Sequence, residues 1–177
     1  MAQALGRPAF PRLVSFGSLS KRSNAPGLRS GYVAGDAALL KAFLLYRTYH
    51  GSAMSRVVAA ASIAAWGDES HVRANRAEYA AKFVALRPRL ADAFACAMPD
   101  AAFYLWAKTP IDDGIFARQL LAEQALTVLP GSFLARDADG TNPGRGYIRI
   151  ALVASRDECA EAVDRMLALA RSLQGMK

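Results

Sequence analysis

Short apolar runs alternate with stretches of helical spacing along this chain, and this alternation predicts a mixed α/β fold. Residues 13–16 form one apolar run and a second surrounds Tyr32 and Val33, so we expect two strands separated by a polar loop. Asp36 then stands at a helix-cap position, before apolar residues spaced by three and four. Gly51 should end that helix. Its predicted apolar face comprises Leu39, Leu40, Phe43 and Leu44.

Two further helices are predicted in the middle of the chain. The first covers residues 52–66, and a long amphipathic helix follows Gly67 and Asp68. Pro88 should kink this second helix or break it locally, because proline lacks the N–H that continues the hydrogen-bond ladder. Its apolar face should comprise Val72, Tyr79, Phe83, Leu86, Leu90 and Phe94.

The last third of the chain predicts three strands and two helices. Ser155 and Glu158 form the S-x-x-E pattern of a capping box, which opens a terminal helix. We expect everything after about residue 39 to form one α/β unit. The predicted strands are 103–106, 126–129 and 148–153, and a helix over residues 115–124 lies between the first two. The terminal helix should bury Val163, Leu167 and Ala170.

Composition narrows the class of protein. With 177 residues, 53% hydrophobic and 21% charged, the chain has the apolar content of a globular domain and not that of a disordered or collagenous one. No apolar run approaches the roughly 20 residues of a membrane span. Residues 1–11 lack the apolar centre of a signal peptide, so we expect a cytoplasmic protein with no membrane partner.

The net charge and the two cysteines predict no further binding site. The net charge of +7 permits nucleic-acid binding, but the basic residues are scattered without a basic stripe or a known signature, so we expect no nucleic-acid partner. Cys96 and Cys159 lie on segments predicted to be helical and lack the spacing of metal ligands. They should be buried free thiols, and we expect no metal site.

The polar loop that follows the first strand carries the candidate chemistry. Lysine is the side chain that forms Schiff bases with aldehydes, and Lys21 lies among small, turn-forming residues that can hold it against a ligand. Arg29 offers a planar fork suited to a phosphate, and Ser18 offers a hydroxyl for the same anion. Gly27 and Gly31 allow close backbone approach on either side of the arginine. These residues together predict a lysine with its own phosphate clamp.

The loop does not complete either of two other motifs that bind through a serine or a lysine. Ser18-x-x-Lys21 matches the S-x-x-K of serine β-lactamases, but the chain has no S-D-N, has Lys108-Thr109-Pro110 in place of K-T-G, and carries Pro26 where a helix should run. No G-x-x-x-x-G-K-[ST] phosphate loop occurs.

The loop resembles the signature of the fold type I pyridoxal-phosphate aminotransferases of class I and II, S-x-S-K-x-x-x-x-x-G-x-R-x-G, with every position filled between Ser18 and Gly31. The resemblance implies that pyridoxal 5'-phosphate is the cofactor. It implies that Lys21 forms the Schiff base with this cofactor and then carries the proton between substrate and cofactor. It also implies that Ser18 and Arg29 bind the cofactor phosphate.

The resemblance extends to the C-terminal part of the chain. Residues 102–106 look like a strand of the family's small domain, and residues 128–133 resemble its V-x-P-G-x-x-F turn. Arg149, in the segment GYIRIAL, matches the arginine that binds the substrate α-carboxylate in this family. Without the resemblance, Arg149 would be an edge-strand arginine between apolar neighbours.

Within the family, the segments look most like the bacterial N-succinyldiaminopimelate aminotransferases of lysine and diaminopimelate biosynthesis. That implies amino-acid and 2-oxo-acid substrates, with 2-oxoglutarate as amino acceptor, and a homodimer. The alternatives are another class I/II amino-acid aminotransferase, or an inactive remnant that dimerises. Tyr49, His50 and Arg145 are further candidates for a substrate pocket.

The resemblance covers roughly the C-terminal half of such an enzyme. We therefore expect the α/β fold to be the end of the large-domain sheet plus the α/β small domain. Residues 1–38 would be a remnant of the large cofactor-binding domain, and residues 39–177 the connecting long helix and the small domain. The family's cofactor-stacking ring and the aspartate for the pyridine nitrogen precede the lysine segment, so we expect weak or no activity from this chain alone.

Overall fold

The computed structural model of the chain describes residues 6, 10–51, 53–91 and 93–175. It divides into two compact units, residues 1–75 and residues 76–177. Most of residues 1–11, considered above for a targeting signal, and Ser52, where the second helix was predicted to begin, fall outside the described residues. The helices predicted to end at residues 51 and 66 thus belong to the first unit, so the residues after about 39 do not form one unit. The boundary at residue 38 refers to the domains of a longer enzyme and stays a prediction.

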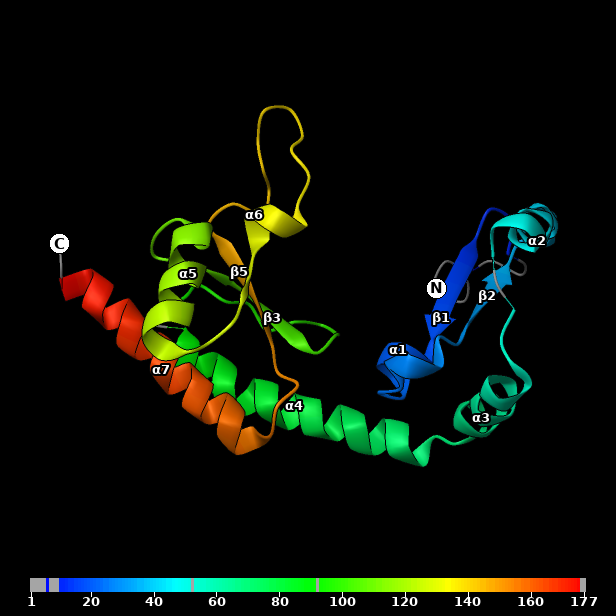
Figure 1. Cartoon of the computed structure of the whole chain (residues 1–177), viewed down its shortest axis with the longest axis horizontal. Helices are drawn as coiled ribbons and strands as arrows, with labels where there is room; N and C mark the ends of the chain where they lie inside the picture. Colours follow the sequence, from blue (N-terminus) through cyan, green and yellow to red (C-terminus); the bar gives the residue numbers. More distant parts are fainter. Residues whose placement is uncertain (1–5, 7–9, 52, 92, 176–177) are drawn as a thin grey trace. The chain divides into compact units, whose positions relative to one another are not determined.

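A two-stranded antiparallel sheet organises the first unit (Figure 1). Strand β1 (Val14–Ser18) pairs with β2 (Gly31–Gly35), and Ser18 lies opposite Gly31. The predicted strand–loop–strand arrangement is confirmed. The connecting loop contains the one-turn helix α1 (Leu19–Arg22) and a 3-10 turn, η1 (Pro26–Leu28).

Helices α2 (Ala37–His50) and α3 (Arg56–Gly67) complete most of this unit. Asp36 caps α2 as predicted, because its carboxylate accepts hydrogen bonds from the N–H groups of Ala38 and Leu39. The predicted apolar face of α2 contains no fully buried residue. The described residues of the first unit cover this face only in part, because Leu40 and Phe43 are half-buried while Leu39 and Leu44 are exposed.

Helix α4 (Ser70–Leu90) is continuous, and the boundary between the two units falls within it. The predicted break at Pro88 does not occur inside the helix, which ends two residues later. The proline therefore marks the end of α4. Four of the predicted face residues of α4 are buried, together with Phe94 beyond its end, while Tyr79 packs partly buried against the core.

The second unit contains a three-stranded antiparallel sheet in the order β3–β5–β4 (Figure 1). Side chains alternate along β3 and β5 between the core and the opposite face. Helices of this unit supply the other side of the core, which includes Phe94, Phe116 and Met166. The elements are β3 (Tyr104–Lys108), α5 (Asp113–Gln124), β4 (Leu129–Pro130), α6 (Gly131–Leu134), β5 (Tyr147–Ala151) and α7 (Arg156–Gly175).

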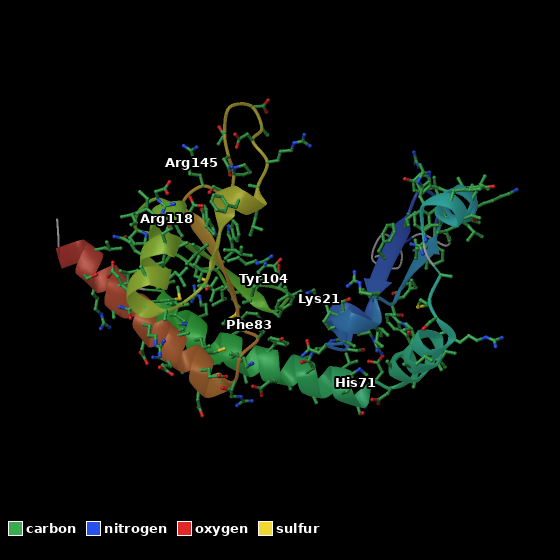
Figure 2. The ribbon with its side chains drawn as sticks, in the orientation of Figure 1. Lys21, His71, Phe83, Tyr104, Arg118 and Arg145 are labelled. Carbon is green, nitrogen blue, oxygen red and sulfur yellow. The ribbon has the colours of Figure 1, made fainter. Side chains whose placement is uncertain are left out.

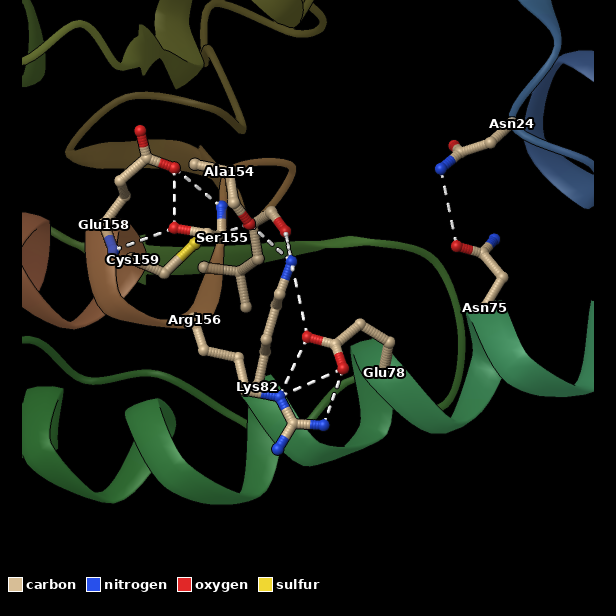
Figure 3. Close-up of polar contacts among 10 residues, drawn as sticks. Asn24, Asn75, Glu78, Lys82, Ala154, Ser155, Arg156, Glu158 and Cys159 are labelled. Carbon is tan, nitrogen blue, oxygen red and sulfur yellow. Dashed lines mark hydrogen bonds and ion pairs between the residues drawn. The ribbon is translucent and has the colours of Figure 1, made fainter.

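A buried lysine closes the end of β5 (Figure 3). Lys82 is 5% exposed and donates hydrogen bonds from Nζ to the carbonyl oxygens of Leu152, at 3.1 Å, and Ala154, at 2.5 Å. Beside it, the Ser155–Glu158 capping box forms as predicted, with Ser155 N–H donating to Glu158 Oε2 at 2.9 Å. The backbone carbonyl groups just beyond the end of β5 therefore have hydrogen-bond partners.

Both cysteines are buried and free, as predicted. Burial raises the pKa of each thiol, which keeps both in the neutral form. Cys159 lies in α7, but Cys96 does not lie in a helix: it forms an isolated antiparallel bridge with Ala107.

Candidate functional site

The lysine segment folds into a closed turn whose two ends are paired. The Ser18 hydroxyl caps α1 by accepting the N–H of Ser20 at 3.1 Å, and it lies 3.2 Å from the carbonyl oxygen of Ser30. The carbonyl of Ser30 also accepts the N–H of Leu19 at 3.1 Å. Lys21 lies in the last turn of α1 and is exposed (Figure 2). The fold thus brings Ser18 beside the residues that follow Arg29.

Arg29 lines a groove in the first unit. Its backbone is left-handed, with φ of 49°, and its guanidinium donates to the carbonyl oxygen of Pro26 at 3.2 Å. The groove has a volume of about 840 Å³ and also takes in Arg47, so its lining holds two cations and no carboxylate. Such a lining favours an anion. Ser18 and Lys21 are not among its lining residues.

Arg22, the residue after Lys21, connects α1 to the segment where α3 ends and α4 begins. The Arg22 guanidinium donates to the carbonyl oxygen of Ala65 at 2.8 Å and lies 4.9 Å from the ring centre of Trp66. It also forms an ion pair with Glu69. A helix of one turn is marginal by itself, so these contacts help to determine where Lys21 lies.

Ser23, the next residue, takes part in a chain of hydrogen bonds with His71 and Asp68. His71 Nε2 lies 2.9 Å from the Ser23 hydroxyl, and His71 Nδ1 lies 2.6 Å from Asp68 Oδ2 (Figure 2). Hydrogen bonds from Ser70 and His71 hold the pKa of Asp68 far below its ordinary value. Asn24 then donates to Asn75 at 3.4 Å (Figure 3). Sequence reasoning missed this fastening, for which the only signal was three polar residues directly after the lysine.

Arg149 belongs to the second unit and lies on its central strand, so the edge position expected from its neighbours alone is wrong. It stands opposite Trp106 on one side and Leu129 on the other. These residues point away from the core, because the residues that alternate with them are buried. The Arg149 guanidinium lies 5.4 Å from the ring centre of Tyr104. A cation supported in this way suits a carboxylate.

A groove of about 590 Å³ adjoins the same face of the sheet. Tyr104 and Trp106 line it, and so does Tyr147, whose ring stacks on Trp106 with centres 5.6 Å apart. Arg87 lies in its lining and donates from Nε to the carbonyl oxygen of Cys96 at 2.8 Å. Arg149 therefore stands beside an aromatic surface.

The other predicted pocket residues line neither groove. Tyr49 and His50 are exposed at the end of α2, where the His50 ring stacks on Tyr46 at 4.4 Å. Arg145 is exposed in the loop that follows α6 (Figure 2). Within the described ranges, no group of three or more His, Cys, Asp or Glu side chains could hold a metal ion. No helix in that part of the chain combines the length and apolar composition needed to cross a bilayer.

The sequence model of the family "Aminotransferase class I and II" matches residues 4–166 of this chain. The chain belongs to this family. A probable aminotransferase of Mycobacterium tuberculosis is 36% identical over 157 residues, which are 87% of this chain and 35% of that protein. The family predicted from the lysine segment is thereby confirmed.

Solved structures confirm the fold of this class I/II aminotransferase chain. A crystal structure of an aminotransferase from Neisseria meningitidis superposes with a TM-score of 0.87 at 57% identity, over 96% of this chain and 43% of that one. A probable N-succinyldiaminopimelate aminotransferase from Thermus thermophilus gives a TM-score of 0.79 at 28% identity, over 90% and 42%. The chain spans about two fifths of the length of these relatives.

Proposed function

We propose that the chain is part of a pyridoxal-phosphate-dependent aminotransferase. The observation that carries the proposal is the lysine segment, which contains every signature residue and folds into one turn closed by the pairing of Ser18 with Gly31. The enzyme would transfer an amino group from an amino acid to a 2-oxo acid.

Each site residue has a role that suits its chemistry. Lys21 would hold the cofactor through its aldehyde group and would move a proton at the substrate Cα. Arg29 and Ser18 hold the phosphate, by charge and by hydrogen bonding respectively. Arg149 binds the substrate carboxylate through its two parallel N–H groups. The cofactor supplies the electron sink that makes the Cα proton acidic.

The residues present fit the phosphate end of the cofactor. Arg29 and Arg47 contribute two cations to the lining of their groove, whose lining residues include no carboxylate, and Gly27 in the same lining has open space where a Cβ atom would stand. Pyridoxal phosphate carries a dianionic group that such a surface attracts.

N-Succinyl-LL-2,6-diaminopimelate is our proposed amino donor, with 2-oxoglutarate as acceptor. Support comes from the Thermus thermophilus relative of that name and from several relatives named LL-diaminopimelate aminotransferase, one of them 34% identical over 160 residues. Another class I/II amino-acid substrate is the alternative.

We further propose that the enzyme is a homodimer. Large apolar side chains of α2 and α3 are exposed in the first unit, among them Tyr49 at 78% and Val57 at 79%. Apolar patches of this kind favour association. Sedimentation velocity at several concentrations tests this proposal.

The decisive experiment maps the lysine that pyridoxal phosphate modifies. The purified chain is mixed with the cofactor, reduced with borohydride and digested for peptide mass spectrometry. The sequence has five lysines, and Lys41 and Lys108 are exposed like Lys21, which makes them internal comparators. We expect at least about tenfold preference for Lys21, since a bound phosphate raises the local concentration of the aldehyde.

Two variants separate a phosphate site from general reactivity. Arg29→Ala should abolish the preference for Lys21, whereas Arg56→Ala removes an arginine of α3 outside the groove and should preserve it. Inorganic phosphate should compete in the wild-type chain. Uniform labelling of Lys21, Lys41 and Lys108 would refute a cofactor site in this chain.

A further inference from the structure

One buried carboxylate joins three segments of the second unit. Asp113 is the first residue of α5 and is 0% exposed. Its Oδ2 accepts hydrogen bonds from the N–H and the hydroxyl of Ser132, at 2.9 and 2.6 Å. Its Oδ1 accepts the N–H of Gly146 at 3.0 Å. The start of α5, the turn after β4 and the residue before β5 therefore meet at this group.

The carboxylate of Asp113 is ionised in the folded chain. Burial by itself would raise its pKa, but the hydrogen bonds from Ser132 and Gly146 outweigh that effect, and the pKa lies below its ordinary value. Hydrogen bonds to an ionised acceptor are roughly twice as strong as neutral ones. The N-terminus of α5 also favours a negative charge at this position.

Close backbone packing surrounds the same junction. A Cβ atom on Gly131 would lie 2.3 Å from the carbonyl oxygen of Gly144, so the two segments touch without side chains between them. Asn142 bridges them, because its Nδ2 donates to the Ser132 carbonyl at 3.1 Å and its Oδ1 accepts the Gly144 N–H at 2.9 Å. The base of the loop after α6 is thus held to the sheet edge.

The two residues that Asp113 binds, Ser132 and Gly146, are each close to Arg149 along the chain or through strand pairing. Gly146 directly precedes β5 and comes three residues before Arg149. Ser132 comes three residues after Leu129, which pairs directly with Arg149. Because β4 has only two residues, its pairing with β5 is short, and Asp113 adds two side-chain hydrogen bonds that hold Ser132, in the turn after β4.

We propose that Asp113 is a positioning residue, which orients Arg149 for the carboxylate of the substrate by holding the turn after β4 against the start of β5. The role in substrate binding rests on the proposed function, whereas the effect on the orientation of Arg149 does not. A purely structural Asp113 would change the stability of the second unit and leave Arg149 in place in the folded protein.

Nuclear magnetic resonance of the full 177-residue chain distinguishes the two roles. Three quantities are followed well below each variant's melting temperature: amide exchange at Ser132 and Gly146, the nuclear Overhauser contact between the Arg149 side chain and the Tyr104 ring, and the dissociation constant of 2-oxoglutarate from its effect on the Arg149 Nε–H signal. Asp113→Asn tests the proposal.

Asp112→Asn is the matched control. Asp112 is the neighbouring carboxylate, and its Oδ1 accepts the N–H of Ile115 at 3.0 Å, so it caps α5 without touching Ser132 or Gly146. Ser132→Ala is a milder second variant, which removes the 2.6 Å hydroxyl contact and keeps both backbone donors. Arg149→Lys removes the planar fork and serves as the reference for lost carboxylate binding.

In Asp113→Asn we expect exchange at both amides to accelerate about tenfold or more, the contact with Tyr104 to disappear and 2-oxoglutarate to bind about tenfold more weakly. Asp112→Asn should change none of these, and Ser132→Ala should change them in the same direction by less. A folded Asp113→Asn or Ser132→Ala chain that keeps the wild-type contact between Arg149 and Tyr104 overturns the proposal. If the wild-type chain binds no 2-oxoglutarate, the proposed role of Arg149 fails, while the contact with Tyr104 still decides the role of Asp113.

Discussion

Gly131→Ala should destabilise the second unit through a single methyl group. The added Cβ would lie 2.3 Å from the Gly144 carbonyl oxygen, 2.8 Å from Trp106 Cη2 and 2.9 Å from the Tyr147 carbonyl oxygen. Two of these three atoms belong to the backbone and cannot rotate away. Overpacking of this kind costs about 1–3 kcal/mol, and backbone displacement places Gly131 at the upper end.

An opposing effect reduces the net change. Alanine restricts the unfolded chain more than glycine does, which favours folding by about 0.4–1 kcal/mol. The difference leaves a loss of about 2 kcal/mol in the free energy of unfolding. Gly114→Ala is the matched control, because its Cβ would meet only side-chain atoms, Asp112 Oδ1 at 3.3 Å and Arg118 NH1 at 3.6 Å.

Urea denaturation followed by Trp106 fluorescence measures this loss. The chain has two tryptophans, and a Trp66→Phe background leaves Trp106, which stacks on Tyr147 beside the substituted turn. Gly114→Ala should change the free energy of unfolding by less than about 1 kcal/mol, because gained helix propensity offsets the tighter contact. If Gly131→Ala and Gly114→Ala unfold within about 0.5 kcal/mol of each other, the close approach of the two segments does not exist as described.

Three more perturbations test the junctions around the candidate site. His71→Ala should speed hydrogen exchange in the peptide that contains α1, measured by mass spectrometry, whereas His50→Ala, which alters only an exposed ring stack, should not. Ser62→Ala should lower the free energy of unfolding of the first unit by about 1 kcal/mol in urea denaturation, since Ser62 is 4% exposed and its hydroxyl donates to the hydroxyl of Ser30 at 2.8 Å. The folded pKa of Asp113 lies below the unfolded value of about 3.9, so its contribution to stability is present above that pH and lost as pH falls through the folded value. Denaturation at pH 7, 5 and 3 should show a loss below about pH 4 that is smaller in Asp113→Asn, and an equal loss in both chains would contradict this assignment.

Local signals predicted the parts of the fold that are made by neighbouring residues. The cap at Asp36 and the capping box of Ser155 and Glu158 form as expected, because each joins residues no more than three positions apart. The lysine segment was also predictable, since turn-forming residues and glycines specify its course. Sequence reasoning reached the candidate lysine through its spacing from Ser18 and Arg29 and through the resemblance to the family signature.

Distant contacts account for what the sequence did not reveal. The strand predicted at residues 126–129 begins only at Leu129, and α6 was not predicted. The start of α6 is held by Asp113, nineteen residues before Ser132 in the sequence, and by the contact of Gly131 with Gly144. The fastening of α1 by His71 spans 48 residues. No periodicity within either segment carries that information.

Helix α2 shows what a hydrophobic pattern does and does not report. The helix and its cap were predicted correctly, yet Leu44 is 70% exposed and Leu39 48% exposed. An isolated helix of 14 residues is marginal in water, so packing of an apolar face normally provides its stability. The pattern therefore specifies that α2 packs against a further surface, but spacing along one helix contains nothing about the identity of that surface. In the homodimer proposed above, α2 would become buried as the protein concentration rises, and the partner would supply the missing surface. The exposed apolar face of α2 is therefore the feature of the first unit that favours association.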